Sequence, residues 1–141
     1  MVASSAADVE MLRSALTHVF APWVVQLDMR VLEVGEGEVV LALPVTERHV
    51  HEGGVLCGQT MMAAADTAMV LAIMTKIGGF KPMTTVQMNT SFLRPVPGQS
   101  GVARVNARVL RMGRTLIFGE VHIVNADDEL SAHMTTTYTL L

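Results

Sequence analysis

A single carboxylate, Asp66, lies in the middle of the most apolar stretch of the chain, MMAAADTAMVLAIM at residues 61–74. The stretch is long enough for several helical turns and contains no Gly or Pro, which predicts a buried helix. No Lys or Arg occurs between Gly53 and Thr75 to pair with this carboxylate. Because burying an unpaired charge is costly, Asp66 is either satisfied by local hydroxyl groups such as that of Thr67 or used in chemistry. Such a carboxylate can attack a carbonyl carbon or take a proton from water.

Composition and charge limit the classes of function. The chain has 141 residues, which predicts one domain, 1–141, with a core of its own and a helical lead-in at residues 1–22. Half of the residues are hydrophobic and only 16% are charged, which predicts an extensive interface between subunits. The net charge is −3 and no basic run occurs, so we expect no nucleic acid partner.

The cysteine count and the apolar run indicate the expected compartment and whether the chain enters a membrane. One cysteine excludes an internal disulfide framework and a site built from cysteine clusters, and we expect no metal. The first residues lack the basic segment of a signal peptide, so we expect a reducing, cytoplasmic location. The run 61–74 is too short for a hydrocarbon layer of about 30 Å and carries Asp66 at its centre, so no membrane association is expected.

Hydrophobic periodicity predicts two strands, one long helix and then four strands. The expected helices cover about residues 7–19 and 57–76, and the expected strands cover about 23–32, 39–43, 84–92, 104–109, 117–123 and 130–140. Pro22 ends the first helix and Gly78 follows the second. A helix that is apolar on all sides buries most of its surface only inside a curled sheet. We therefore expect an α+β fold, one antiparallel sheet wrapped around the long helix, with a second subunit covering the rest.

Four segments resemble those of a known family, in the same order. The segment GVLCGQTMMAAADTA (54–68) resembles the G-x-x-H-G-G pattern and L-A-D-T-A type ending of the PaaI-like acyl-CoA thioesterases. Three later segments resemble the family's F-x-R-P strand, late hairpin and final turn: VQMNTSFLRPVPG (86–98), RMGRT (111–115) and VNADDELSA (124–132). The resemblance covers about residues 23–141 and implies a hotdog fold and an acyl-CoA substrate. Coenzyme A is then part of the substrate, and no separate cofactor is expected.

The resemblance also implies a catalytic set. Asp66 falls on the family's catalytic carboxylate, and Gly58 falls on the glycine whose amide binds the oxyanion. Three positions depart from the pattern: Cys57 replaces a histidine, Gln59 replaces the second glycine, and His51 replaces an Asn or Gln. At its position, His51 would help to orient the nucleophile or the water.

Five residues are expected to contact the substrate. Cys57 lies at the start of the helix, and Thr85 aligns with a family Ser or Thr that positions water. Arg94, Arg111 and Arg114 are candidates for the phosphates of coenzyme A, because arginine offers planar, bidentate contacts to such groups. Each of these residues also has an ordinary structural interpretation, as a solvated charge or a packed small side chain.

Helix geometry then predicts a site shared between subunits. Gly58 and Asp66 are eight residues apart on one helix, which is about 12 Å along the axis. One thioester carbonyl cannot reach both groups in the same chain. Two antiparallel helices related by a two-fold axis bring Gly58 of one subunit opposite Asp66 of the other. We expect a homodimer with two sites, or a dimer of such dimers.

Three functions fit these observations. The first is an acyl-CoA thioesterase with Asp66 as nucleophile or general base. The second is a hotdog dehydratase or hydratase, but the long helix lacks the glutamate that the resemblance to dehydratases would require. The third is a non-catalytic acyl-CoA binding protein, although a binder gains nothing from a buried acid.

Overall fold

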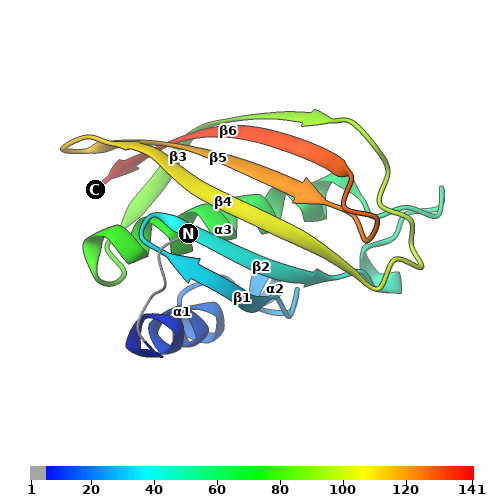
Figure 1. The fold of residues 1–141 in the computed structure, drawn as a ribbon, viewed down its shortest axis with the longest axis horizontal. Coiled ribbons are helices and arrows are strands. Elements are labelled where there is room, and N and C mark those ends of the chain that lie inside the picture. Colours follow the sequence, from blue (N-terminus) through cyan, green and yellow to red (C-terminus); the bar gives the residue numbers. More distant parts are fainter. Residues whose placement is uncertain (1–5) are drawn as a thin grey trace.

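The computed structural model describes residues 6–141, and the first five residues of the expected domain lie outside them. Figure 1 shows one long helix, α3, covered by a single curved sheet, with the short helices α1 and α2 near strand β1. The elements are α1 (Ala6–His18), α2 (Pro22–Val25), β1 (Arg30–Gly35), β2 (Glu38–Pro44), a 3-10 turn (Glu47–His49), α3 (Gly58–Ile77), β3 (Met83–Phe92), β4 (Val102–Met112), β5 (Leu116–Val124) and β6 (Leu130–Leu140).

The six strands form one antiparallel sheet in the order β1-β2-β4-β5-β6-β3. Along the central strands every second residue points toward α3 and is buried, as Val105 and Ala107 of β4 and Val121 of β5 show. The residues between them point to the outer face of the sheet. This period of two separates a core face from an outer face, and the expected α+β architecture is confirmed.

Small side chains let α3 lie close to the sheet. Ala64, Ala65 and Ala68 are fully buried, and the helix interior contains no Gly or Pro to interrupt it. The helix ends as expected at Gly78, whose φ of 82° places it in the left-handed region that glycine adopts without strain. Its N–H donates a hydrogen bond of 2.9 Å to the carbonyl of Met74, which satisfies one of the last carbonyls of the helix.

Gly119 of β5 leaves room for a side chain of α3. A Cβ atom at this position would lie 2.1 Å from Cε of Met69, whose side chain is fully buried. A larger residue at position 119 would push on a side chain that has no free space around it. Gly119 therefore accommodates the Met69 side chain between the helix and the sheet.

The length of α3 alone does not distinguish a core helix from a membrane-spanning one. The helix has 20 residues, more than the apolar run 61–74, and a mean hydropathy of 1.3 over its most apolar window. By length and composition it is long enough to cross a membrane. However, 61% of that window is buried inside the fold, as expected for the core helix of a sheet-wrapped domain.

The expected strand over residues 23–32 is wrong in its first part. Residues Pro22–Val25 form α2, and β1 begins only at Arg30. Proline suits the first turn of a helix, where its missing N–H has no intrahelical partner. Asp28 then adopts a φ of 55°, which ends any extended conformation. One helical turn followed by a bend thus mimics a period of two and still buries Leu27.

Strand β3 contains a bulge beside the middle of α3. Thr85 pairs with Tyr138 and Gln87 pairs with Thr137, so Val86 is an extra residue in the ladder. The bulge turns Thr85 toward α3, the same side as Met88, which pairs with the inward-facing Thr136. Strict alternation would have placed Thr85 and Met88 on opposite faces. Bulges of this kind commonly re-aim a side chain at functional sites.

One stripe of α3 and the free edge of β3 stay open in the single chain. On the helix, Met62 is exposed, and Ala63, Asp66 and Val70 are only partly buried. Strand β3 is the last strand of the sheet, and Val86 on it is 58% exposed. A free strand edge with apolar side chains is a surface for pairing with another strand.

Candidate functional site

Asp66 faces two hydroxyl groups of the sheet. Thr85 donates a hydrogen bond of 2.9 Å from Oγ1 to Oδ1 of Asp66, and the Tyr138 hydroxyl donates one of 2.6 Å to the same oxygen. Within residues 6–141, Oδ2 of Asp66 accepts no hydrogen bond. The carboxylate is therefore oriented through one oxygen, while the other is available to a water molecule or a substrate atom.

The alternative in which the Thr67 hydroxyl hydrogen-bonds to Asp66 is wrong. Thr67 is buried, and its hydroxyl donates a hydrogen bond of 2.8 Å to the carbonyl of Ala63, one turn earlier in the helix. The carboxylate is instead held by residues from two strands that pair with each other, β3 and β6. Two donors from a rigid sheet fix its direction better than a neighbour on the same helix.

Tyr138 is a site residue that sequence reasoning missed. It is the only tyrosine of the chain, it lies on the inner face of β6, and its side chain is fully buried. Burial raises the pKa of its phenol far above the ordinary value, and the nearby charge of Asp66 raises it further. The phenol therefore stays protonated and donates its hydrogen to the carboxylate. In the sequence, Tyr138 could have been noticed as a single tyrosine among inward-facing Met and Thr residues of the last strand.

A pocket of about 370 Å³ opens beside the carboxylate. Its wall combines Asp66, Thr85 and Tyr138 with apolar side chains, which include the aromatic rings of Phe20, Trp23 and Phe80. Trp23 is 60% exposed in the single chain, so this wall is open on one side. The pocket can hold an apolar group with its polar end against Asp66.

The methionines of α3 divide between core and surface. Met69 and Met74 are buried against the sheet and do not line the pocket beside Asp66. Met61 is buried and contributes to the wall of a second pocket, near the start of the helix. The methionines of the helix therefore serve mainly as ordinary core.

The second pocket, of about 330 Å³, brings together three of the predicted residues, His51, Gly58 and Arg94. Gly58 is the first residue of α3, where backbone N–H groups lack intrahelical acceptors and the helix dipole favours negative charge. A Cβ atom at position 58 would lie 3.0 Å from Cζ of Phe92, an aromatic ring that is 52% exposed. The absence of a side chain keeps the helix start accessible beside that ring.

His51 and Cys57 have local partners near the helix start. His51 is exposed and lines the pocket, and its Nδ1 accepts a hydrogen bond of 2.9 Å from the N–H of Gly53. Cys57 is the residue before the helix, and its Sγ lies 3.1 Å from Oγ1 of Thr60. Both residues lie beside Gly58 and apart from the Asp66 pocket.

The three arginines predicted to contact phosphates do not lie close together within one chain. Arg94 lies just after β3, and its guanidinium donates a hydrogen bond of 3.3 Å to the carbonyl of Leu130 at the start of β6. Arg111 and Arg114 are exposed in and beside the turn that connects β4 to β5. The strand pairing places this turn at the opposite end of the sheet, near the end of β6. The phosphate contacts of one ligand cannot include all three arginines of a single chain.

The candidate residues thus fall into two groups on one helix. The group at the start of α3 offers N–H groups and an imidazole to an anion. The group in the middle offers a carboxylate and an apolar pocket. Neither pocket contains the set of side chains that a metal ion requires; within the described residues, the only such set lies on the outer face of the sheet.

Comparisons with known proteins agree on one family. Residues 53–132 match the family model described as the Thioesterase superfamily. A curated relative, "Putative esterase SSO2140" of Saccharolobus solfataricus, is 32% identical over 106 residues, which cover 75% of this chain and 74% of the relative.

Solved structures show the same fold. Zebra fish thioesterase superfamily member 2 superposes with a TM-score of 0.79 and 30% identity, covering 94% of this chain and 95% of that one. The E. coli PaaI protein from the phenylacetic acid degradation operon superposes with a TM-score of 0.81 and 19% identity, covering 98% and 96% of the two chains. The expected hotdog fold is confirmed.

Proposed function

This chain belongs to the thioesterase superfamily, and we propose that it hydrolyses an acyl- or aryl-CoA thioester to the free acid and coenzyme A. The observation that supports this proposal most directly is the geometry of Asp66. One carboxylate oxygen is held by Thr85 and Tyr138, and the other is free beside an apolar pocket that fits an acyl group.

Asp66 can act in either of two ways. As a general base, its free oxygen takes a proton from a water molecule while the water oxygen attacks the thioester carbonyl carbon. As a nucleophile, the same oxygen attacks that carbon and forms an acyl-enzyme anhydride, which water then hydrolyses. In both cases the C–S bond breaks, and the coenzyme A thiolate leaves and takes up a proton.

The carbonyl oxygen becomes negative during either reaction and needs a donor that Asp66 cannot provide. The N–H of Gly58 is such a donor, but the two residues of one chain face different pockets. A two-fold dimer through the open stripe of α3 and the β3 edge would place Gly58 of the partner subunit beside Asp66. Each such donor typically contributes about 10²–10³ in rate.

A dimer would also change which arginines act together. Arg94 of one subunit and the Arg111–Arg114 pair of the other could then share one coenzyme A molecule. His51, which lies in the Gly58 pocket, would meet the thioester near the carbonyl. The assignment of these residues to phosphate and carbonyl contacts rests on this arrangement.

A thiol-release assay over a panel of acyl- and aryl-CoA substrates tests the proposal. We expect wild-type protein to hydrolyse at least one member, and Asp66→Asn to lower the rate by about 10²–10⁴-fold while the fold is kept. Asp127→Asn is the matched control, because Asp127 is an exposed acid in the turn between β5 and β6.

Three outcomes would contradict the proposal. An Asp66→Asn variant with wild-type turnover would exclude the assigned carboxylate. Saturable acyl-CoA binding without turnover by the wild-type protein would identify a binding protein instead. Hydration of an enoyl-CoA without thiol release would identify the dehydratase or hydratase class.

A further inference from the structure

Three polar side chains form a cluster on the outer face of the sheet, opposite to α3. Glu120 and His122 are two residues apart on β5 and therefore point to the same face. His133 of β6 pairs directly with His122 in the sheet register. Directly opposed residues of antiparallel strands have Cβ atoms about 5 Å apart, so the register itself brings the three side chains together.

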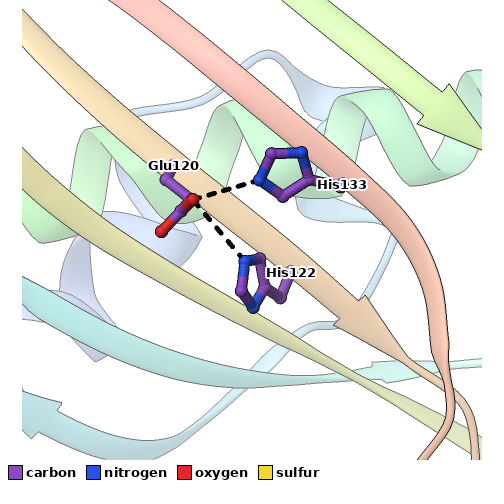
Figure 2. Close-up of side chains that lie close together, drawn as sticks. All are labelled: Glu120, His122 and His133. Carbon is purple, nitrogen blue, oxygen red and sulfur yellow. Dashed lines mark hydrogen bonds and ion pairs between the residues drawn. The ribbon is translucent and has the colours of Figure 1, made fainter.

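Figure 2 shows the carboxylate of Glu120 directed toward both imidazole rings. Oε2 of Glu120 lies 3.1 Å from Nε2 of His133 and 3.7 Å from Nε2 of His122. The three ligand atoms all lie within 4.8 Å of one another. The side chains of Glu120 and His133 are only partly exposed, at 22% and 34%, whereas that of His122 is 45% exposed.

Two of the three separations are close to those of a tetrahedral metal site, and all three are within 4.8 Å. Zinc bonds to nitrogen and carboxylate oxygen are about 2.0–2.2 Å long, which puts neighbouring ligand atoms about 3.3–3.6 Å apart. The observed separations of 3.1 and 3.7 Å differ from this range by only a few tenths of an ångström at most. Side-chain rotations of the two histidines would let all three atoms surround one ion.

We propose that Glu120, His122 and His133 form a binding site for a divalent transition-metal ion, with Zn²⁺ as the probe. Two neutral imidazoles and one carboxylate are a common ligand set for zinc and related ions. The three protein ligands leave a fourth position for water. A groove of about 310 Å³, lined in part by Glu120 and His122, gives solvent access to that position.

Arg108 of β4 is a charged residue that contacts Glu120 of this cluster. Its Nη2 lies 2.9 Å from Oε1 of Glu120, the carboxylate oxygen that does not face the imidazoles. This contact orients Oε2 toward His122 and His133 and balances the charge of the carboxylate before an ion binds. Groups that hold a metal ligand in place in this way typically alter affinity by about 10–100-fold.

Isothermal titration with ZnCl₂ tests the site, with untagged, EDTA-stripped full-length protein at about pH 7.5. We expect one zinc ion per chain and a Zn²⁺-dependent rise in Tm, because an ion that binds only the folded chain stabilises it. His122→Gln, His133→Gln and the double variant should each bind zinc at least about tenfold more weakly. All three should fold, because the two side chains face the outside of the sheet.

His18→Gln is the matched control, because His18 is exposed at the end of α1, away from the sheet face. This variant should keep the wild-type stoichiometry, affinity and Tm shift. Absence of saturable zinc binding by the wild-type protein would overturn the proposal. Zinc binding that persists unchanged in the double variant would overturn it as well, since the ion would then sit elsewhere, for example near Cys57 and His51.

Discussion

The hydroxyl oxygen of Tyr138 lies 2.6 Å from Oδ1 of Asp66, although 72 positions separate the two residues in the chain. Tyr138 comes from the inner face of β6, and the bulge of β3 brings Thr85 to the same carboxylate oxygen. The carboxylate of a helix is thus oriented by the sheet that wraps around it. Its function as a nucleophile or base depends on that orientation, and we expect it to be sensitive to each donor.

Tyr138→Phe should lower kcat about tenfold or more and leave KM nearly unchanged. The variant removes one hydrogen bond to a charged group, and such bonds contribute about 1.5–3 kcal/mol. Because the Tyr138 hydroxyl acts through Asp66, and phenylalanine keeps the ring that lines the pocket, the effect should appear in turnover. Steady-state kinetics in the thiol-release assay separate the two parameters, and Tm reports the accompanying loss of stability.

Thr137→Val serves as the control for Tyr138→Phe, because Thr137 lies next to Tyr138 on β6 but faces away from α3. Its kinetics should remain those of the wild type. Unchanged kcat in folded Tyr138→Phe would show that Thr85 alone is sufficient to orient the carboxylate.

Gly58→Pro should lower kcat by about 10²–10³-fold, whereas Gly58→Ala should have a much smaller effect. Proline removes the N–H proposed to bind the oxyanion, yet it is well tolerated at the first position of a helix. Alanine keeps the N–H and introduces the same Cβ contact with the exposed ring of Phe92. Comparing the two variants separates loss of the donor from crowding; equal losses would point to crowding alone.

Mixed dimers test whether each site is shared. In a purified heterodimer of one Asp66→Asn chain and one Gly58→Pro chain, one site carries both defects and the other carries neither. We therefore expect close to half of the wild-type activity, although each homodimer is nearly inactive. Tandem affinity tags isolate the heterodimer. A site contained in one chain would leave every site with a defect, and the heterodimer would then be as inactive as its parents.

Glu120→Gln should destabilise the metal-free protein at neutral pH but not in acid. The hydrogen bond with His133 lowers the pKa of Glu120 below its ordinary value, with Arg108 contributing and burial opposing. A carboxyl group with a lowered pKa stabilises the folded chain above its unfolded pKa, and this stabilisation is lost as the pH falls through the folded pKa. Because the partners are partly exposed, we expect about 0.5–1 kcal/mol.

Urea denaturation in EDTA at about pH 7 and at a pH below the lowered pKa of Glu120 measures this difference. The free energies of unfolding of wild type and variant should differ at the higher pH and converge at the lower one. A difference that persists unchanged in acid would mean that the glutamine disturbs packing and that charge is not involved.

The sequence carries strong local signals for most of the fold. The apolar run around Asp66, the glycine at position 78 and the alternation of the later strands are properties of single elements, and each was predicted correctly. The segment from Trp23 to Met29 was predicted wrongly, because a short helical turn and a bend can place apolar residues at every second position.

The site depends on relationships between elements, which local patterns do not contain. The bulge at Val86 shifts the register of β3, and only the pairing of β3 with β6 brings Tyr138 to Asp66. Likewise, His122 and His133 meet because of the register between β5 and β6. Asp66 itself could be identified as a candidate, because a lone carboxylate in an apolar helix stands out without any knowledge of pairing.

The strand order also has a consequence for biosynthesis. Strand β3 has β6 as its only partner in the sheet, and the ribosome makes β6 after β4 and β5. A nascent chain that has already formed α3 must therefore wait for its final strand before β3 can dock. Asp66 can receive its Tyr138 contact only once β6 has been made, so its carboxylate is aligned after β3, β4 and β5 have been synthesised.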